Sequence, residues 1–162
     1  MAVERSRSAP ISDKRFTLDT NILIYSIDSQ AGTRQRMARQ VIDLALRRDC
    51  WLTLQAVSEF YAAATRKGRM AITEAAAQAG DWLDLFPCLP SSPTAVRTAL
   101  AMAASARASY WDALLVATAA EGGCSAILTE DLADGALLGG VRVLNPFGSS
   151  SLAPAAMLLL DQ

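Results

Sequence analysis

A short strand that runs directly into a helix, with an aspartate at the junction, constrains this chain more than any other stretch. Residues 16–18 alternate apolar and polar side chains, which is typical of a strand, and residues 19–21 turn into an apolar run that predicts a helix ending near residue 26. Asp19 therefore lies at the carboxyl end of a strand, the edge where an open α/β sheet binds ligands. The alternative is that Asp19 or Thr20 only caps the helix.

Strands and helices alternate along the rest of the chain. The expected strands cover residues 51–53, 126–128 and 141–144, and the connector 87–90 has room for another. The expected helices are 33–46 with Thr33 as its cap, 55–66, 73–86, one that starts at Ser92-Pro93, and one from Ser109 to Gly122-Gly123. This alternation implies a mostly parallel sheet with helices on both faces.

The periodicity of the helices also predicts which side chains they bury. Apolar residues recur at intervals of three and four, as expected for a helix with one face toward the core. Among the residues expected to be buried are Phe60, Tyr61, Trp82, Leu83 and Leu100.

Length and composition fit one domain with a substantial core. The chain has 162 residues, of which 52% are hydrophobic. We expect a polar N-terminal extension over residues 1–14, a domain over residues 15–148 and a tail over residues 149–162. The tail is rich in serine and then apolar. It packs on the domain, packs on a partner or is disordered.

Several classes of protein are excluded or disfavoured. The chain contains no histidine, so Ser-His-Asp chemistry and histidine-bound zinc are ruled out. Its three cysteines are far apart and are expected to be small buried hydrophobic residues in a reducing compartment. Residues 1–14 lack the apolar centre of a signal peptide, and no run is long enough to span a membrane. We therefore expect a cytoplasmic protein.

Four acidic residues stand where a parallel-sheet fold can bring them together. Asp19 and Asp131 follow expected strands, Asp112 lies in the first turn of a helix, and Glu59 lies inside a helix between apolar residues. Each has a simpler interpretation. Asp112 forms an S-x-x-D capping box with Ser109, Glu59 faces solvent, and Asp131 caps a turn.

A cluster of these carboxylates would need a cation. Two carboxylates about 4 Å apart repel by roughly 4 kcal/mol at an effective dielectric constant near 20. Ligands that are all oxygen favour Mg²⁺ or Mn²⁺, and such ions activate water and stabilise charge on a phosphate. The cluster therefore indicates metal-dependent hydrolysis of phosphodiester bonds, which needs no histidine.

The segments LDTNIL, AVSEF, YWDALLVATA, ILTED and VLNPF follow one another at domain-like spacing. In this order they resemble the PIN-domain family, specifically the VapC-like ribonuclease toxins of type II toxin–antitoxin modules, from Phe16 to Phe147. The resemblance implies an α/β/α sandwich around a mostly parallel sheet. It also implies an Mg²⁺- or Mn²⁺-dependent endoribonuclease that cuts structured RNA such as tRNA or rRNA, forms a homodimer and is inhibited by a small antitoxin.

The resemblance also assigns roles to the acidic residues. Asp19, Glu59, Asp112 and Asp131 match the family's acidic quartet and would be catalytic and metal-binding. Asp19 and Asp112 would bind the ion directly. Glu59 and Asp131 would complete the site and help to orient the attacking water.

Polar residues near these acids receive supporting roles. Asn21 and Thr129 match polar positions of the family beside the first and last acids, where they would support the site or simply cap. Glu130 and Asp134 are close in sequence to the last acid and are expected to face solvent.

Basic side chains near the acids are candidates for holding an RNA backbone. The first set follows the third expected helix, and the second lies on the helix over residues 33–46. They are Arg66, Lys67 and Arg69, and Arg34, Arg36 and Arg39. A solvated charged face is the simpler interpretation of each.

Three other functions compete with a toxin. A phosphatase of the haloacid-dehalogenase type also begins with an Asp after its first strand but needs a second Asp where this chain has Asn21. A catalytically inactive dimeric interaction module would keep the fold without needing the acids. A PIN-fold nuclease could also act in RNA processing, outside toxin–antitoxin systems.

Overall fold

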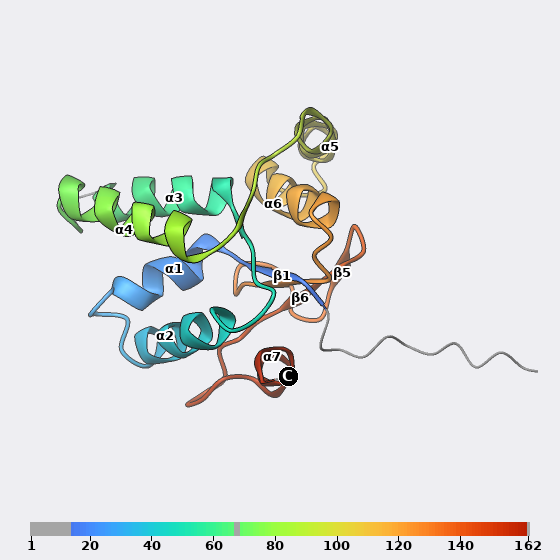
Figure 1. Ribbon diagram of the computed structural model, residues 1–162. Helices are drawn as coiled ribbons and strands as arrows, with labels where there is room; N and C mark the ends of the chain where they lie inside the picture. The colour runs from blue at the N-terminus through green and yellow to red at the C-terminus, as the bar shows by residue number, and fades with distance from the viewer. Residues whose placement is uncertain (1–13, 67–68, 162) are drawn as a thin grey trace, which may run out of the picture.

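The computed structural model describes residues 14–66 and 69–161, in which short strands lie at the centre and helices surround them (Figure 1). The strands are β1 (Phe16–Leu18), β2 (Leu52–Thr53), β3 (Cys88–Leu89), β4 (Ala126–Leu128), β5 (Leu137–Leu138) and β6 (Val141–Leu144). The helices are α1 (Thr20–Ile27), α2 (Thr33–Ala45), α3 (Leu54–Thr65), α4 (Ile72–Leu85), α5 (Pro93–Ala104), α6 (Tyr110–Glu121) and α7 (Pro154–Leu160).

The sheet is mostly parallel, as the sequence predicts. Strands β1, β4 and β6 are parallel neighbours, and β2 pairs with β3 in parallel. A parallel bridge between Phe16 and Cys50 joins the two groups of strands. The register pairs Leu18 with Leu128, so β1 and β4 end at the same edge of the sheet.

Strand β5 was not expected from the sequence. It pairs antiparallel with β6 across a tight turn through Gly139 and Gly140, whose φ angles are 55° and 83°. Residues without a Cβ adopt such positive φ angles at little cost, and glycine pairs are typical of two-residue hairpins. The pattern Leu-Leu-Gly-Gly-Val is therefore the signal that could have revealed this hairpin.

Alternation along the strands divides the core between two helical layers. Ala126 and Leu128 of β4 pack in a cluster with residues of α1, α2, α3, α4 and α7. Ile127, between them, packs in a second cluster with Leu115 and Ala119 of α6. Successive side chains of a strand point to opposite faces, so this split produces the predicted three-layer α/β/α arrangement. Figure 1 shows α1 to α4 on one side of the strands and α5 and α6 on the other.

The predicted caps of α5 and α6 are right, α3 and α4 begin one residue earlier than expected, at Leu54 and Ile72, and the cap of α2 differs. Ser92 and Ser109 cap α5 and α6, and their side chains accept hydrogen bonds from the backbone N–H groups of Ala95 and Asp112. Thr33 is the first residue of α2 rather than its cap, because Gly32 occupies the capping position without a side-chain hydrogen bond.

The prediction of burial is wrong for three side chains. Tyr61, Leu83 and Leu100 are 38%, 47% and 55% exposed. On α4 and α5, the face that is buried against the core is narrower than the apolar pattern of the sequence suggests. Helix α5 packs on α6 through the small residues Ala95 and Ala99. Close packing through alanine leaves a larger side chain such as Leu100 on the outer surface.

The cysteines are free thiols, as expected. Cys50 and Cys124 are buried, and Cys88 is half-buried. Among the described residues, no helix is both long enough and apolar enough to cross a bilayer.

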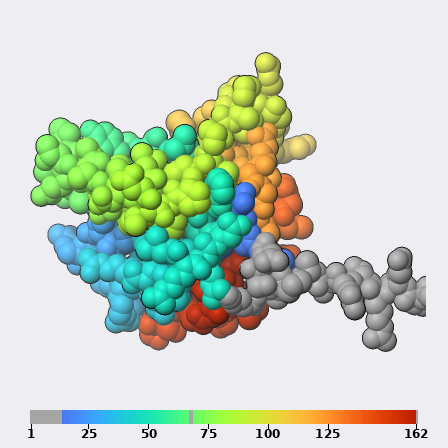
Figure 2. All heavy atoms as spheres, viewed as in Figure 1, coloured from blue at the N-terminus to red at the C-terminus, as the bar shows by residue number. Residues whose placement is uncertain are grey.

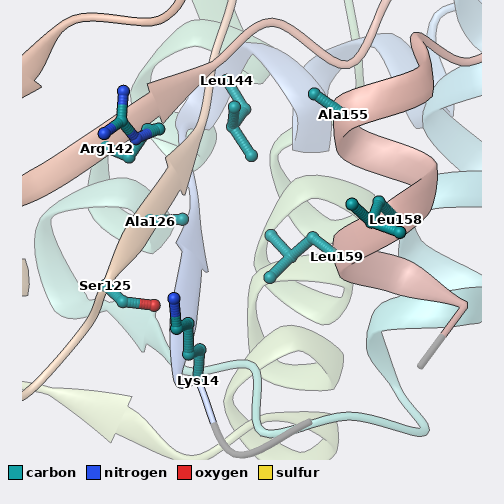
Figure 3. Close-up of a pocket in the computed structure, with 8 residues that line it drawn as sticks. All are labelled: Lys14, Ser125, Ala126, Arg142, Leu144, Ala155, Leu158 and Leu159. Carbon is teal, nitrogen blue, oxygen red and sulfur yellow. The ribbon is translucent and has the colours of Figure 1, made fainter. Parts of the chain in front are cut away.

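The C-terminal tail packs on the domain, which decides between the alternatives that the sequence left open. Helix α7 buries Ala156 and Leu160 in the larger core cluster, and Arg48 donates a hydrogen bond to the Leu160 carbonyl at 2.9 Å. In the space-filling view, α7 in red lies at the lower edge of the molecule and α5 at the upper edge (Figure 2). A groove of about 240 Å³ remains between α7 and the sheet, with Leu159 on one side and Arg142 and Leu144 of β6 on the other (Figure 3).

Because α7 belongs to the core, its buried leucine should stabilise the whole fold. Leu160 is 0% exposed and Leu158, in the same helix, is 58% exposed. We expect Leu160→Ala to lower the free energy of unfolding by about 2–5 kcal/mol. Leu158→Ala should change it by no more than about 0.5 kcal/mol. Chemical denaturation measures both, and equal effects of the two substitutions would contradict this packing of α7.

Candidate active site

Asp19 connects the sheet to the first helix. It follows β1 directly and is the N-cap of α1, where its Oδ1 accepts a hydrogen bond from the Thr20 backbone N–H at 2.7 Å. Its Oδ2 accepts a hydrogen bond from the Thr129 hydroxyl, also at 2.7 Å. Asp19 is therefore a helix cap, and its side chain also bonds to the residue that follows β4.

The four acids singled out from the sequence line one cleft of about 470 Å³. They come from the end of β1, from α3, from the first turn of α6 and from the turn after β4. Parallel strands bring the first and last acids to the same edge, and α3 and α6 supply the other two. The lining residues are Asp19, Thr20, Asn21, Ile24, Tyr25, Asp28, Glu59, Arg69, Asp112 and Asp131.

A hydrogen-bond network joins the first and last acids. The Thr129 hydroxyl donates to Asp19 and accepts from the Asn21 side-chain amide at 3.0 Å and from the Asp131 backbone N–H at 3.1 Å. The same Asn21 amide donates to Asp131 Oδ2 at 3.0 Å. Asn21 and Thr129 thus lie between the two acids, beside which the sequence placed them.

Glu59 and Asp112 have fixed partners of their own. The Gln55 amide nitrogen donates to Glu59 Oε1 at 2.6 Å and to the Trp111 carbonyl at 2.9 Å. The Ser109 hydroxyl accepts from the Asp112 backbone N–H at 3.1 Å and donates to the Asp112 carboxylate at 2.7 Å, so Ser109 caps the helix as expected, but the reciprocal bond of a capping box to the Ser109 backbone N–H does not form. The Asp112 carboxylate therefore supports the cap through the Ser109 side chain and also lines the cleft.

Burial and neighbouring charges raise the pKa of Asp19. Burial raises the pKa of Asp19 from 3.8 to about 6. The hydrogen bonds from Thr129 and Thr20 oppose the rise in pKa, and the charges of Asp131 and Glu59 add to it. At neutral pH the ionised Asp19 therefore carries an electrostatic cost that a cation in the cleft would relieve.

The donor set suits a divalent ion held partly by water. In residues 14–66 and 69–161, no three acidic or cysteine side chains converge closely enough to form a complete ligand group. Mg²⁺ commonly uses one or two carboxylates and keeps several waters, so an open acidic cleft fits it better than a closed cage would. The carbonyl oxygen of the Asn21 side chain, which lines the cleft, is also buried without a hydrogen-bond donor, so a further oxygen atom lies beside the carboxylates.

The structure adds residues to the cleft and corrects one expectation. Thr20, Tyr25 and Asp28 line the cleft, although only their closeness in sequence to Asp19 pointed to them. Glu130 does not face solvent as expected, because its side chain is only 15% exposed and pairs with Arg34. Asp134 is exposed, and it also accepts a hydrogen bond from the Asn145 backbone N–H at 2.8 Å.

The basic candidates separate into different positions. Arg69 lines the cleft, Arg66 is exposed at the end of α3 outside the lining, and Lys67 lies outside the described residues. On α2, Arg36 donates to the Ser150 carbonyl and Arg39 to the Ser26 carbonyl. Arg69 is therefore the basic side chain that this geometry places beside the acids.

Comparison with solved structures identifies the same fold in toxin–antitoxin proteins. A chain of DNA-bound VapBC from Salmonella typhimurium is 18% identical and gives a TM-score of 0.59 over 80% of this chain and 96% of that one. A toxin–antitoxin complex from Klebsiella pneumoniae gives 23% identity and a TM-score of 0.58, with coverage of 81% and 97%. VapC20 from Mycobacterium tuberculosis, a toxin that cleaves the sarcin–ricin loop, gives 14% identity and a TM-score of 0.57, with coverage of 72% and 89%.

The sequence comparisons identify the family. No curated protein matches this chain in sequence. The PIN domain family, however, matches residues 16–133, which include β1, the four acids and the turn after β4. The fold described above is the one found in VapC toxin structures. The chain belongs to the PIN domain family.

Proposed function

We propose that this protein is a metal-dependent endoribonuclease and the toxin of a toxin–antitoxin pair. The observation that carries the proposal is the convergence of Asp19, Glu59, Asp112 and Asp131 on one cleft at the carboxyl edge of the sheet. The absence of histidine leaves carboxylates and a bound ion as the means of hydrolysis. Structured RNA, such as tRNA or rRNA, is the proposed substrate, in keeping with the named target of VapC20.

In this proposal the four acids form two pairs with different roles. Mg²⁺ or Mn²⁺, when bound, lowers the pKa of a water and stabilises charge on the phosphate. Asp19 and Asp112 would bind the ion, and Glu59 and Asp131 would complete the site and orient the attacking water. Thr129 holds the Asp19 carboxylate, Asn21 holds Asp131, and Gln55 holds Glu59.

The surroundings of the cleft fit an RNA backbone and an inhibitor. Arg69 contributes a positive charge to the wall, where it would contact a phosphate next to the one that is cut. We propose a small antitoxin as partner, as in the VapBC complexes that share the fold, and a homodimer as the working form. A basic side chain of an antitoxin could enter the acidic cleft and replace the charge of the ion.

Loss of one proposed ligand should abolish cleavage. We expect Asp19→Asn to lower the rate of cutting by about a hundredfold or more, because it removes a charged ligand of the ion. The measurement is digestion of total RNA by purified protein with Mg²⁺ or Mn²⁺, beside a sample with EDTA. Asp84→Asn is the matched control, since Asp84 is exposed on α4 and does not line the cleft.

The outcomes of this digestion separate the candidate functions. Discrete fragments that depend on the metal and disappear with Asp19→Asn would support the nuclease. No cutting by folded wild-type protein would instead favour the inactive interaction module. Metal-dependent cutting that an added cognate antitoxin fails to suppress would favour a PIN nuclease of RNA processing.

The raised pKa of Asp19 predicts how stability depends on pH in the metal-free protein. Between about pH 4 and pH 6 the folded state holds a proton that the unfolded state has lost, so the free energy of unfolding falls as pH rises through this window. Asp19→Asn cannot ionise and escapes this loss. Relative to wild type, we expect the variant to gain on the order of 3 kcal/mol between pH 4 and pH 7.5. Urea denaturation in EDTA measures this gain, and a difference that does not change with pH would contradict it.

A further inference from the structure

The side chain of Glu130, next to the last acid of the cleft, is held by two residues from different helices. The Tyr25 hydroxyl of α1 donates a hydrogen bond to Glu130 Oε1. The Arg34 Nε of α2 donates a hydrogen bond to Glu130 Oε2 at 2.9 Å, and the Arg34 Nη2 forms an ion pair with the same oxygen at 2.8 Å. Both oxygens of the carboxylate are therefore bonded, although Glu130 does not line the cleft.

Aromatic rings fix the positions of the two residues that hold Glu130. The Arg34 guanidinium lies 5.5 Å from the ring centre of Phe147 and 5.8 Å from that of Tyr25. The Tyr25 and Phe147 rings pack edge to face with centres 5.6 Å apart. Contacts of a guanidinium with ring faces limit its freedom, so less conformational entropy is lost when Arg34 binds Glu130.

Helix α1 contacts the turn after β4 at three consecutive residues. Asn21 and Tyr25 are four residues apart and thus lie on one face of the helix. Asn21 donates to Thr129 and Asp131, and Tyr25 donates to Glu130 between them. The position of this turn relative to α1 is set by both contacts together.

We propose that Tyr25, Arg34 and Glu130 act as positioning residues that hold Asp131 at the edge of the cleft. This proposal rests on the proposed function in its consequence for metal binding. Asp131 is exposed, and its charge and that of Asp19 repel each other. Held only by its hydrogen bonds to Asn21 and Thr129, Asp131 could move outward, and the anchored Glu130 prevents that movement.

Arg34 has a second effect in this arrangement. Glu130 and Asp131 are adjacent acids, and Arg34 neutralises the first. Without Arg34, Glu130 would keep only the Tyr25 hydroxyl as a partner and its charge would repel Asp131, which would displace the turn from the cleft. Arg34 therefore serves to position Asp131 rather than to contact RNA, although its sequence position also allowed an RNA-binding role.

Metal affinity measured without RNA tests this inference. We expect Glu130→Ala and Arg34→Ala each to weaken Mn²⁺ binding in isothermal titration calorimetry by about tenfold, as is usual when a residue that orients a ligand is lost. The double variant should bind no more weakly than either single variant, because both substitutions break one contact. Glu130→Gln, which keeps an oxygen for Arg34, should retain most of the affinity.

Arg36→Ala is the matched control. Arg36 lies two residues along α2, is exposed and donates to the Ser150 carbonyl, away from Glu130. Its loss should leave the Mn²⁺ affinity unchanged. Equal weakening by Arg36→Ala and Arg34→Ala, or no weakening by either, would overturn the proposal.

Backbone dynamics distinguish failure of this inference from failure of the proposed function. We expect nitrogen relaxation in the metal-free protein to show lower order parameters at residues 129–131 in Glu130→Ala and Arg34→Ala, with β4 unchanged. If wild-type protein binds no Mn²⁺, the proposed function fails and the order parameters alone decide whether these residues hold the turn. Unchanged order parameters at residues 129–131 would then overturn the inference.

Discussion

Repulsion between carboxylates at one edge of a parallel sheet is the constraint on which the rest of the site depends. The fold buries Asp19 at the end of β1, with Asp131 and Glu59 close enough for their charges to raise its pKa further. Such a cluster persists only if its members are held by other groups. Thr129, Asn21 and Gln55 perform this task with hydrogen bonds, and Glu130 anchors the last acid through its own partners. The same repulsion is what a divalent ion would relieve, so the feature that destabilises the metal-free cleft also favours binding of the ion.

Local capping and a place in the cleft are not alternatives in this protein. Asp19 caps α1, as its simplest interpretation required, Asp112 accepts a hydrogen bond from the cap Ser109 of α6, and both acids also line the cleft. A capping residue must stand at a helix start, and in a parallel α/β fold a helix that follows a strand, as α1 follows β1, starts at the carboxyl edge of the sheet. Helix α6 follows α5 and leads into β4, and its first turn lies at the same cleft. The geometry that makes a residue a good cap therefore also directs it toward the ligand-binding edge.

Features that depend on local pattern could be predicted from the sequence, and those that depend on distant contacts could not. The strand–helix junction at Asp19, the caps Ser92 and Ser109 and the strands β4 and β6 follow from neighbouring residues alone. Convergence of the four acids could be inferred from strand ends and from resemblance to the family. Glu130 was expected to face solvent because its partner Arg34 lies 96 residues away. Leu100 was placed in the core because periodicity gives the apolar side of a helix but not the width of the face that α6 covers.

The most direct test of the metal-site claim is the position of Mn²⁺ itself. Crystals of the wild-type protein grown with MnCl₂ and measured for anomalous scattering would locate the ion without any assumption about substrate. We predict a peak in the cleft within bonding distance of Asp19 and Asp112, and no peak there in crystals of Asp19→Asn. An empty cleft in wild-type crystals at saturating Mn²⁺, or a peak bound only to acids outside the cleft, would contradict the claim that these carboxylates form a metal centre.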